Sequence, residues 1–379
     1  MTDTDHHDFN DSERSSSASP APARSTPHTS RTSFSTRSVS PTPSVWSMTS
    51  SLRAEAYIQE FGRDLNNISE IYHLPADAEE LERLDRQHEI FKEVIGKYIP
   101  PLPQAMADDA PGEAKAVLDL GCGSGAWYVI CLLSKFDSPS GTRIMEAAAD
   151  FPHCNAVAID LVPMQSLNMP PNCSRSEVDD VNLGLEHFYG DFNVVHCRLI
   201  SSGIQDYEHM IDQISHVLRP EGLIDLTEWD FHCYNEDFQR IELDDVTTME
   251  KPWWPRWLAY LEMAVRRRGG DVDSAIHIHD WVSRHPRFED VIYNEYFIPA
   301  TPWVTDSTLD LHIGVAMREN MQIFLKSGRP LLLGNGVPEP LVDELQANAH
   351  KELLEDDTRY YIRMQSVYAR KLHRSQPYG

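Results

Sequence analysis

The chain has 379 residues, of which 41% are hydrophobic, and it carries a formal net charge of −26 at pH 7. This length and composition support one large folded domain or two small ones. So acidic a surface repels nucleic acid and anionic membranes, so we expect neither as a partner. The six cysteines show no CxxC spacing, which is typical of reduced thiols in a cytosolic or nuclear protein.

The first part of the chain divides into a polar tail and an amphipathic helix. Residues 12–50 are mostly Ser, Thr, Pro and Arg, so we predict a disordered tail over residues 1–51. Asp77 followed by Glu80 indicates a helix start, and apolar residues then recur at helical spacing: Leu81, Leu84, Phe91 and Ile95, with His88 on the same stripe. A histidine in that position is more often a structural core residue than a catalytic base.

From residue 116 onwards, strand and helix patterns alternate. Apolar runs predict strands at 116–120, 155–161, 192–197 and 222–228, and a helix over 206–219 precedes the last of these. Two later strands are predicted at 291–298 and 360–368, separated by helices at 309–326 and 338–354. Apolar strands joined by crossover helices predict an α/β fold with a mostly parallel sheet covered on both faces.

The segment 117–125, VLDLGCGSG, joins the first of these strands to a turn with glycine at positions 121, 123 and 125. Glycines there let the backbone approach a ligand closely. Asp119 places a carboxylate beside the turn, which suits a ligand with a cationic amine. No Lys follows as in a phosphate-binding loop, and the third glycine is out of register for a dinucleotide fingerprint.

Acidic residues also follow the next two strands. Asp160 ends the second strand, where a carboxylate can accept both hydroxyls of a ribose. Asp179 and Asp180 follow a third candidate strand, where an acid can accept from an adenine amino group and the backbone N–H of Val181 can donate to the ring. Each acid by itself is also compatible with a helix cap or a solvated surface position.

Several motifs occur in one order: YHLPADAEELERLDRQH (72–88), VLDLGCGSGAW, MPPNCSRSEVDDVNLGLEHF (169–188), NVVHCRLISSGIQDY (193–207) and VLRPEGLIDLTEWDF (217–231). Together they resemble the fungal family of class I S-adenosylmethionine-dependent methyltransferases, which includes regulators of secondary metabolism and natural-product methyltransferases. The resemblance implies a Rossmann-like seven-stranded sheet that binds S-adenosylmethionine. It places Arg198, Gln87 and His88 near the methionine end or the substrate. The candidate cofactor-binding residues are Asp119, Gly121, Cys122, Gly123, Gly125, Asp160, Leu161, Asp179, Asp180, Val181 and Arg198.

Two departures from the family pattern stand out. Asn193 replaces the usual Asp, a minor change in the fourth strand. Tyr128 to Arg143 is an extra segment of sixteen residues that places Asp160 about 40 positions after Gly121, against the ~20 expected of a ribose-binding acid. It is either a loop insertion or a retained intron. We favour the intron for two reasons. The codons for Trp-Tyr-Val read TGG-TAY-GTN and contain the splice-donor sequence GTAYGT. In addition, removal of the segment leaves the reading frame unchanged.

We expect a methyltransferase domain over residues 52–379, with a helical lead-in at 70–100, a cofactor-binding core at 114–230 and substrate-side additions at 231–379. His88 and His196 are the candidate general bases if the acceptor is a hydroxyl. His277, His279, Asp280 and His285 are given structural rather than metal-binding roles, so no metal is expected. Trp253, Trp254 and Trp257 form either core or an apolar substrate wall.

Three functions remain open on the sequence. The first is methylation of a small molecule, and the aromatic-rich segments after residue 231 favour it. The second is a regulator of secondary metabolism that acts through protein partners, which the Ser/Thr/Pro-rich tail would suit. The third is an inactive protein with the cofactor fold, which the extra segment makes credible.

Overall fold

The computed structural model describes residues 50–109, 112, 114–123, 143–163, 170–173, 175–355 and 357–373. These residues all fall within one compact unit, Pro43–Gly379. Gly125, most of the predicted tail and residues 128–142 of the extra segment lie outside the described residues.

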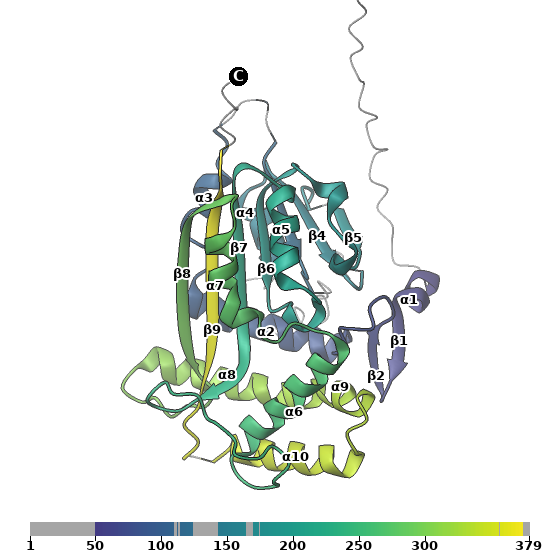
Figure 1. Cartoon of the computed structure of the whole chain (residues 1–379), viewed down its shortest axis with the longest axis vertical. Helices are drawn as coiled ribbons and strands as arrows, with labels where there is room; N and C mark the ends of the chain where they lie inside the picture. The colour runs from purple at the N-terminus through teal and green to yellow at the C-terminus, as the bar shows by residue number, and fades with distance from the viewer. Residues whose placement is uncertain are drawn as a thin grey trace, which may run out of the picture. The chain divides into compact units, whose positions relative to one another are not determined.

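Seven strands among the described residues form one sheet in the order β5-β4-β3-β6-β7-β9-β8 (Figure 1). They are β3 (Ala116–Leu120), β4 (Asn155–Asp160), β5 (Arg175–Val178), β6 (Phe192–Arg198), β7 (Leu218–Tyr234), β8 (Phe288–Pro299) and β9 (Tyr361–Lys371). Strands β3 to β7 pair in parallel, and β9 runs antiparallel to both of its neighbours. The prediction of a Rossmann-like, mostly parallel seven-stranded sheet is confirmed.

The strand order reverses between β3 and β6. The chain passes from β3 outwards to β4 and β5 and then returns to the other side of β3 as β6. In such sheets the ligand crevice forms at the carboxyl ends of the strands beside this reversal. All five residues of β3 are buried, as expected of a central strand covered on both faces.

Helices cover both faces of the sheet. One face packs against α3 (Leu102–Ala105) and α4 (Arg143–Asp150) through Leu102, Ile144 and Ala148. The other face packs against α5 (Tyr207–Val217) and α7 (Ser274–Arg284), which lie in front of the sheet in Figure 1. Helix α5 buries one apolar stripe, as the 3.6-residue period over 206–219 predicted.

A third group of helices lies beyond the end of β7 (Figure 1): α6 (Trp253–Arg268), α8 (Thr308–Ser327), α9 (Arg329–Gly334) and α10 (Glu339–Glu352). With α2 (Ala78–Ile95) they share a separate hydrophobic core. Trp254 and Trp257 are fully buried in it with their rings stacked 5.3 Å apart. These tryptophans were predicted to form either core or the wall of a substrate pocket, and the structure places them in the core.

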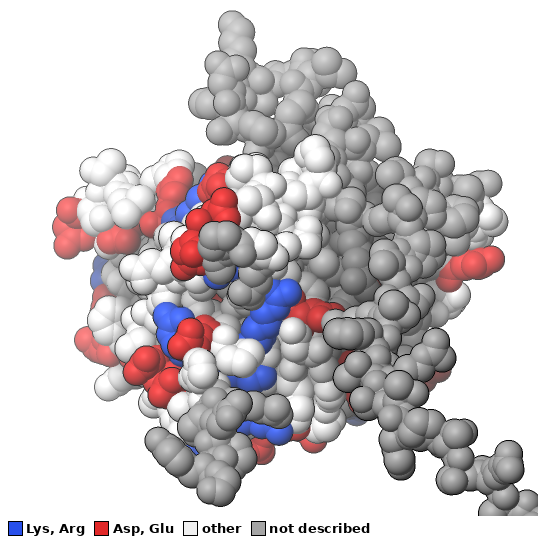
Figure 2. Space-filling model, turned by 90° about the horizontal axis from the view of Figure 1, so that it is seen from above, with Lys and Arg blue, Asp and Glu red and all other residues white. Residues whose placement is uncertain are grey.

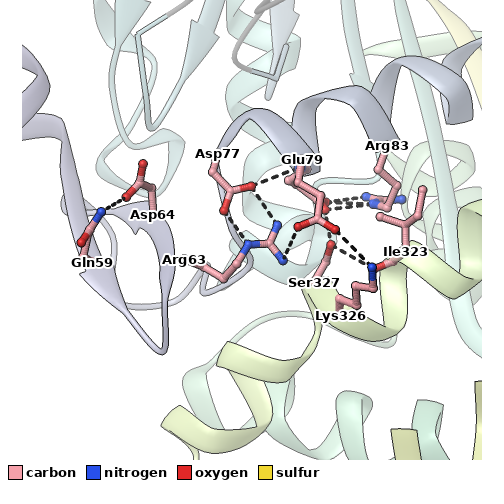
Figure 3. A network of polar contacts seen from close by, with 10 residues as sticks. Gln59, Arg63, Asp64, Asp77, Glu79, Arg83, Ile323, Lys326 and Ser327 are labelled. Atoms are coloured by element: carbon pink, nitrogen blue, oxygen red, sulfur yellow. Dashed lines mark hydrogen bonds and ion pairs between the residues drawn. The ribbon is translucent and has the colours of Figure 1, made fainter. Parts of the chain in front are cut away.

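A hairpin that the sequence patterns did not predict precedes the helical lead-in. Helix α1 (Ser50–Ala56) is followed by the antiparallel strands β1 (Tyr57–Glu60) and β2 (Arg63–Asn66). Arg63 donates to the carboxylate of Asp77, whose Oδ1 also caps α2 by accepting from the N–H of Glu80 (Figure 3). The predicted N-cap of α2 is therefore confirmed, and it also anchors the hairpin.

A buried polar network joins α2 to α8 (Figure 3). Glu80 and Arg83 form an ion pair with N–O contacts of 2.6 to 3.1 Å, and Ser327 donates to the same carboxylate. Asn320 donates to the carbonyl of Arg83 at 2.9 Å and accepts from its guanidinium. These four residues are each at most 4% exposed, so the network holds α2 in one position relative to the helical layer.

The largest boundary differences lie at the two ends of β7, which was predicted at 222–228 and spans Leu218–Tyr234. The predicted helix over 206–219 ends at Val217, and β7 begins at Leu218 rather than at residue 222. Leu218 is fully buried and pairs with Phe192 of β6. Because of this pairing, β7 begins before the Pro-Glu-Gly stretch rather than after it. At its other end β7 continues to Tyr234 because β9 pairs with it beyond a bulge.

None of the helices within the described residues is long and apolar enough to cross a membrane. Figure 2 shows Asp and Glu side chains interspersed with Lys and Arg on the face seen from above. On this face the described acidic side chains therefore alternate with basic ones and do not form one continuous negative patch.

Candidate functional site

One pocket lies at the carboxyl ends of β3, β4, β5 and β6, and α2 and the residues before it form its opposite wall. It is lined by every predicted site residue that the structure describes: Asp119, Gly121, Cys122, Gly123, Asp160, Leu161, Asp179, Asp180, Val181, Arg198, His88 and His196. Gly125 lies outside the described residues. The structure thus brings together residues that are up to 110 positions apart in sequence, as in the pair His88 and Arg198.

The glycine turn forms the floor of the pocket. Gly121 and Gly123 have φ angles of +70° and +75°, in the left-handed region that favours glycine. The N–H groups of Gly121 and Cys122 donate to the carbonyl of Ile159 at 2.9 and 3.0 Å. A Cβ on Gly121 would overlap Cγ2 of Ile200, so this turn is closely packed under the loop after β6.

Asp160 stands at the end of β4 and faces the glycine turn. Its Oδ2 accepts from the N–H of Gly123 at 2.7 Å, and its Oδ1 lies 3.3 Å from the N–H of Val162. Burial raises the pKa of Asp160 to about 6, and the N–H donors counteract that rise. A carboxylate in this position joins the turn to β4.

Asp180 caps a short helix at the end of β5. Its Oδ1 accepts from the N–H and the Nδ2 of Asn182 at 3.0 and 2.7 Å, which starts the 3-10 helix η1 (Val181–Leu183). Asn182 also donates to the carbonyl of Gly203 and accepts from the N–H of Gln205. Asn182 was missed on the sequence, although the D-V-N spacing is a local capping signal.

Arg198, at the end of β6, is held by α2. Its Nη2 lies 2.8 Å from Nδ1 of His88, which must accept because a guanidinium only donates. His88 is 4% exposed, and its Nε2 lies 3.6 Å from Glu146 Oε2. Burial lowers the pKa of His88, and the Glu146 carboxylate counteracts this, so the ring is neutral with its proton on Nε2.

Side chains of His88, Glu89 and Glu146 come within 4.8 Å of one another, a spacing compatible with a metal ion. However, Lys92 Nζ lies 3.0 Å from Glu89 and 2.7 Å from Glu146. The proton that Arg198 forces onto Nε2 of His88 removes that atom as a ligand. The ammonium group of Lys92 thus bridges the two carboxylates and offsets one of their two negative charges.

Three ionisable residues lie at one level of the sheet, and two of them, Asp119 and His196, also line the pocket. Asp119 of β3 pairs in register with His196 of β6, which pairs in register with Asp225 of β7. Nδ1 of His196 is 2.9 Å from Asp225 Oδ2, and all three residues are at most 5% exposed. Asp225 was missed because the register of β7 against β6 is not readable from sequence.

The wall formed by α2 and the residues before it contributes residues that were not predicted as site residues. Tyr72, Pro75, Leu84 and Asp85 line the pocket together with the predicted His88. Burial raises the pKa of Asp85 to about 7, with smaller contributions from Glu89 and Glu82. A carboxyl group with a raised pKa in a cleft is a signal for function that requires the structure.

Residues outside the pocket have structural contacts. Asn193 Oδ1 accepts from the N–H of Ala116 and from Arg219, at 3.0 and 2.9 Å, a role that the family's Asp would also fill. His277 and His279 lie against different aromatic rings, Trp281 and Tyr293. The five cysteines among the described residues are free and buried.

Comparison with known proteins agrees with this geometry. A protein-family model described as a methyltransferase domain matches residues 87–284. The secondary metabolism regulator laeA of Coprinopsis cinerea is 44% identical over 83% of this chain and 73% of its own length. The chain belongs to this methyltransferase family. The family predicted from the motifs is therefore confirmed.

Two further comparisons are more distant. Methyltransferase pytC of Aspergillus terreus is 28% identical over 66% of this methyltransferase chain and 67% of its own. A solved structure of a phosphoethanolamine N-methyltransferase 2 from Haemonchus contortus, with S-adenosylhomocysteine bound, is 15% identical with a TM-score of 0.37. That alignment covers 78% of this chain and 59% of the other.

Proposed function

We propose that this chain binds S-adenosylmethionine in the pocket at the carboxyl ends of β3 to β6 and transfers its methyl group to a small molecule. The observation that supports this most directly is the convergence of a glycine turn and three strand-end acids on one pocket. The acids are Asp119, Asp160 and Asp180, from β3, β4 and the end of β5.

The donor set fits the parts of this cofactor. Asp119 offers a carboxylate to the cationic amino group, and Asp160 offers two oxygens to the ribose hydroxyls. Asp179 and Asp180 lie where the adenine amino group would donate, while Val181 and Leu161 border the ring. Arg198 is assigned to the carboxylate at the methionine end, because His88 holds its guanidinium in the pocket.

The chemistry is in-line displacement at a sulfonium methyl, for which the cofactor supplies the electrophile. The residues of this chain bind, orient and exclude water. Leu81, Leu84, Ile200 and Ile204 line the pocket with apolar side chains, which lowers the local dielectric around the reacting groups. His196 is kept as a candidate base for a hydroxyl acceptor, and His88 is assigned to positioning Arg198.

Two acceptor classes follow from the relatives. The pytC protein is named a methyltransferase, and a small secondary metabolite is the acceptor that we propose for this chain. The 44% identity to a protein named secondary metabolism regulator favours a second candidate, in which the chain acts through protein partners. A metabolite comparison of a deletion strain separates them: loss of one methylated compound supports the first, and loss across many pathways the second.

Calorimetry tests the cofactor site directly. S-adenosylmethionine and S-adenosylhomocysteine are titrated into the full chain and into a version that lacks residues 128–143. Binding to both proteins supports the site as it stands. Binding only to the shortened protein supports the retained-intron interpretation, for which transcript sequencing then gives the decisive check. An absence of binding to either protein contradicts the proposal.

A further inference from the structure

The carboxylate of Asp85 differs from the other described acids of the pocket. Asp160 accepts from the N–H groups of Gly123 and Val162, and Asp180 accepts from Asn182. Oδ2 of Asp85 is buried without a hydrogen-bond partner among the described residues, although the residue lines the pocket. A buried acceptor without a donor costs about 1–3 kcal/mol, a cost that a ligand donor would remove.

Two neighbours on α2 define what Asp85 faces. A Cβ on Gly123, at the end of β3, would lie 4.0 Å from Cδ1 of Leu84. One turn along, His88 bonds to Arg198 at the end of β6. Because Asp85 lies one turn before His88 on the same face of α2 and lines the pocket, we place it opposite the gap between the ends of β3 and β6. That gap is where the strand order reverses and where a ligand is expected.

We propose that Asp85 faces the sulfonium methyl group and accepts the proton that a protic acceptor, an amine or a hydroxyl compound, loses on methylation. This inference rests on the proposed function and deepens it: it names the acceptor class and gives the role of base to Asp85 instead of His196. The acceptor's lone pair forms the new bond to carbon, and the S–CH₃ bond breaks with its electron pair left on sulfur. The N–H or O–H proton passes to the carboxylate of Asp85, from which it later leaves through the pocket to water.

The charges around Asp85 are consistent with this role. Glu82 and Glu89 on its own helix raise the pKa of its carboxyl group in addition to burial, to about 7, so that near neutral pH it both accepts and releases a proton. The other ionisable side chains that line the pocket come from the lead-in and from four strands or their ends: Tyr72, Asp119, Cys122, Asp160, Asp179, Asp180, His196 and Arg198, with His88 on α2 itself.

Sinefungin provides a test that requires no knowledge of the acceptor. It carries an ammonium group where S-adenosylmethionine has its sulfonium methyl, whereas S-adenosylhomocysteine has nothing beyond the sulfur. Both are titrated calorimetrically into the full chain, or into the version without residues 128–143 if only that protein binds nucleoside. We expect Asp85→Asn to weaken sinefungin about tenfold and to leave S-adenosylhomocysteine within about twofold.

Glu93→Gln is the matched control, since it removes one exposed carboxylate from α2 that neither lines the pocket nor contributes to the pKa of Asp85, and it should leave the ratio of the two affinities unchanged. Equal losses for both ligands in Asp85→Asn, or no loss for either, overturn the inference while the cofactor site stands. If S-adenosylhomocysteine fails to bind the parent protein, the proposed function itself fails.

A measurement on the unsubstituted protein covers the case in which Asp85→Asn does not fold. Sinefungin should gain several-fold in affinity over S-adenosylhomocysteine between pH 6 and pH 8, as Asp85 ionises. Asp160, whose pKa is about 6, faces the ribose common to both ligands and cancels in the ratio. A ratio that is constant with pH contradicts the assignment.

Discussion

The guanidinium of Arg198 donates to Nδ1 of His88 across 2.8 Å, so the end of β6 is bonded to the helix that forms the opposite wall of the pocket. The bond requires a neutral imidazole. Burial supplies that condition, because it lowers the pKa of His88 below 6.5.

This lowered pKa predicts a pH dependence of stability. As pH falls below 6.5, His88 is protonated in the unfolded chain before it is protonated in the folded one, so the free energy of unfolding decreases. His88→Asn keeps an acceptor for Arg198 but does not titrate. Urea unfolding at pH 7.5 and 5.5 should show a smaller loss for this variant than for the parent, and equal losses would contradict the assignment. At pH 7.5 the substitution should cost about 1–2 kcal/mol.

Asp160→Asn should weaken the binding of S-adenosylhomocysteine about tenfold or more at pH 7.5. The reason is that an amide has one neutral acceptor oxygen, whereas the carboxylate has two oxygens that share a negative charge. In the parent protein, affinity should fall as pH drops through about 6, the raised pKa of this carboxyl group, since the protonated form accepts less well. Calorimetry at pH 7.5 and 5.5 checks both. Asp237→Asn is the control, because it makes the same substitution at an exposed position, and it should bind like the parent protein. If Asp160→Asn also bound like the parent, the assignment of Asp160 to the cofactor site would be contradicted.

Gly121→Ala combines two costs. Its φ of +70° is unfavourable for alanine, and the new Cβ would overlap Ile200. Gly190→Ala has the first cost without the second, since its φ is +77° and nothing lies within 4 Å of the added Cβ. Urea unfolding should give about 1–2 kcal/mol for Gly190→Ala and about 1–3 kcal/mol more for Gly121→Ala, with nucleoside binding lost only in the latter. Equal effects would show that the turn relaxes around the clash.

Arg83→Met should destabilise the fold by about 3–5 kcal/mol, because it leaves the carboxylate of Glu80 buried without its cation. Arg86→Met is the control three residues along α2. It removes an ion pair to Glu82 in which both side chains are well exposed, so it should change the free energy of unfolding by at most about 0.5 kcal/mol. Adding Glu80→Met to Arg83→Met should restore part of the loss; a double variant as unstable as the single one would contradict the ion-pair explanation.

The parts of the site that could be predicted are those encoded within a few residues. A buried strand that runs into alternating glycines specifies the turn at Gly121 and Gly123, and Asp119 and Asp160 could be placed because an acid at the end of a parallel strand lies at the ligand edge. The spacing between Asp77 and Glu80 predicted the start of α2. Each of these signals depends on backbone geometry that local sequence controls.

The missed residues depend on contacts between distant segments. Asp225 meets His196 only because β6 and β7 adopt one particular register, and a shift of one residue would move its side chain to the opposite face. The hairpin of β1 and β2 was missed because four-residue strands have little periodicity to detect. Asp85 is one acid among several on α2, and only the tertiary structure shows that it lines the pocket.

By itself, the sequence determined the class of fold, the glycine turn and the family, since strand and helix periods, turn residues and motif order are local properties of the chain. The tertiary structure decided which ionisable groups are buried together and so which protons are held where: Arg198 with His88, His196 with Asp225, and Asp85 facing the gap between two strands. Burial and charge proximity set these protonation states, and both arise only when segments far apart in the chain pack against one another.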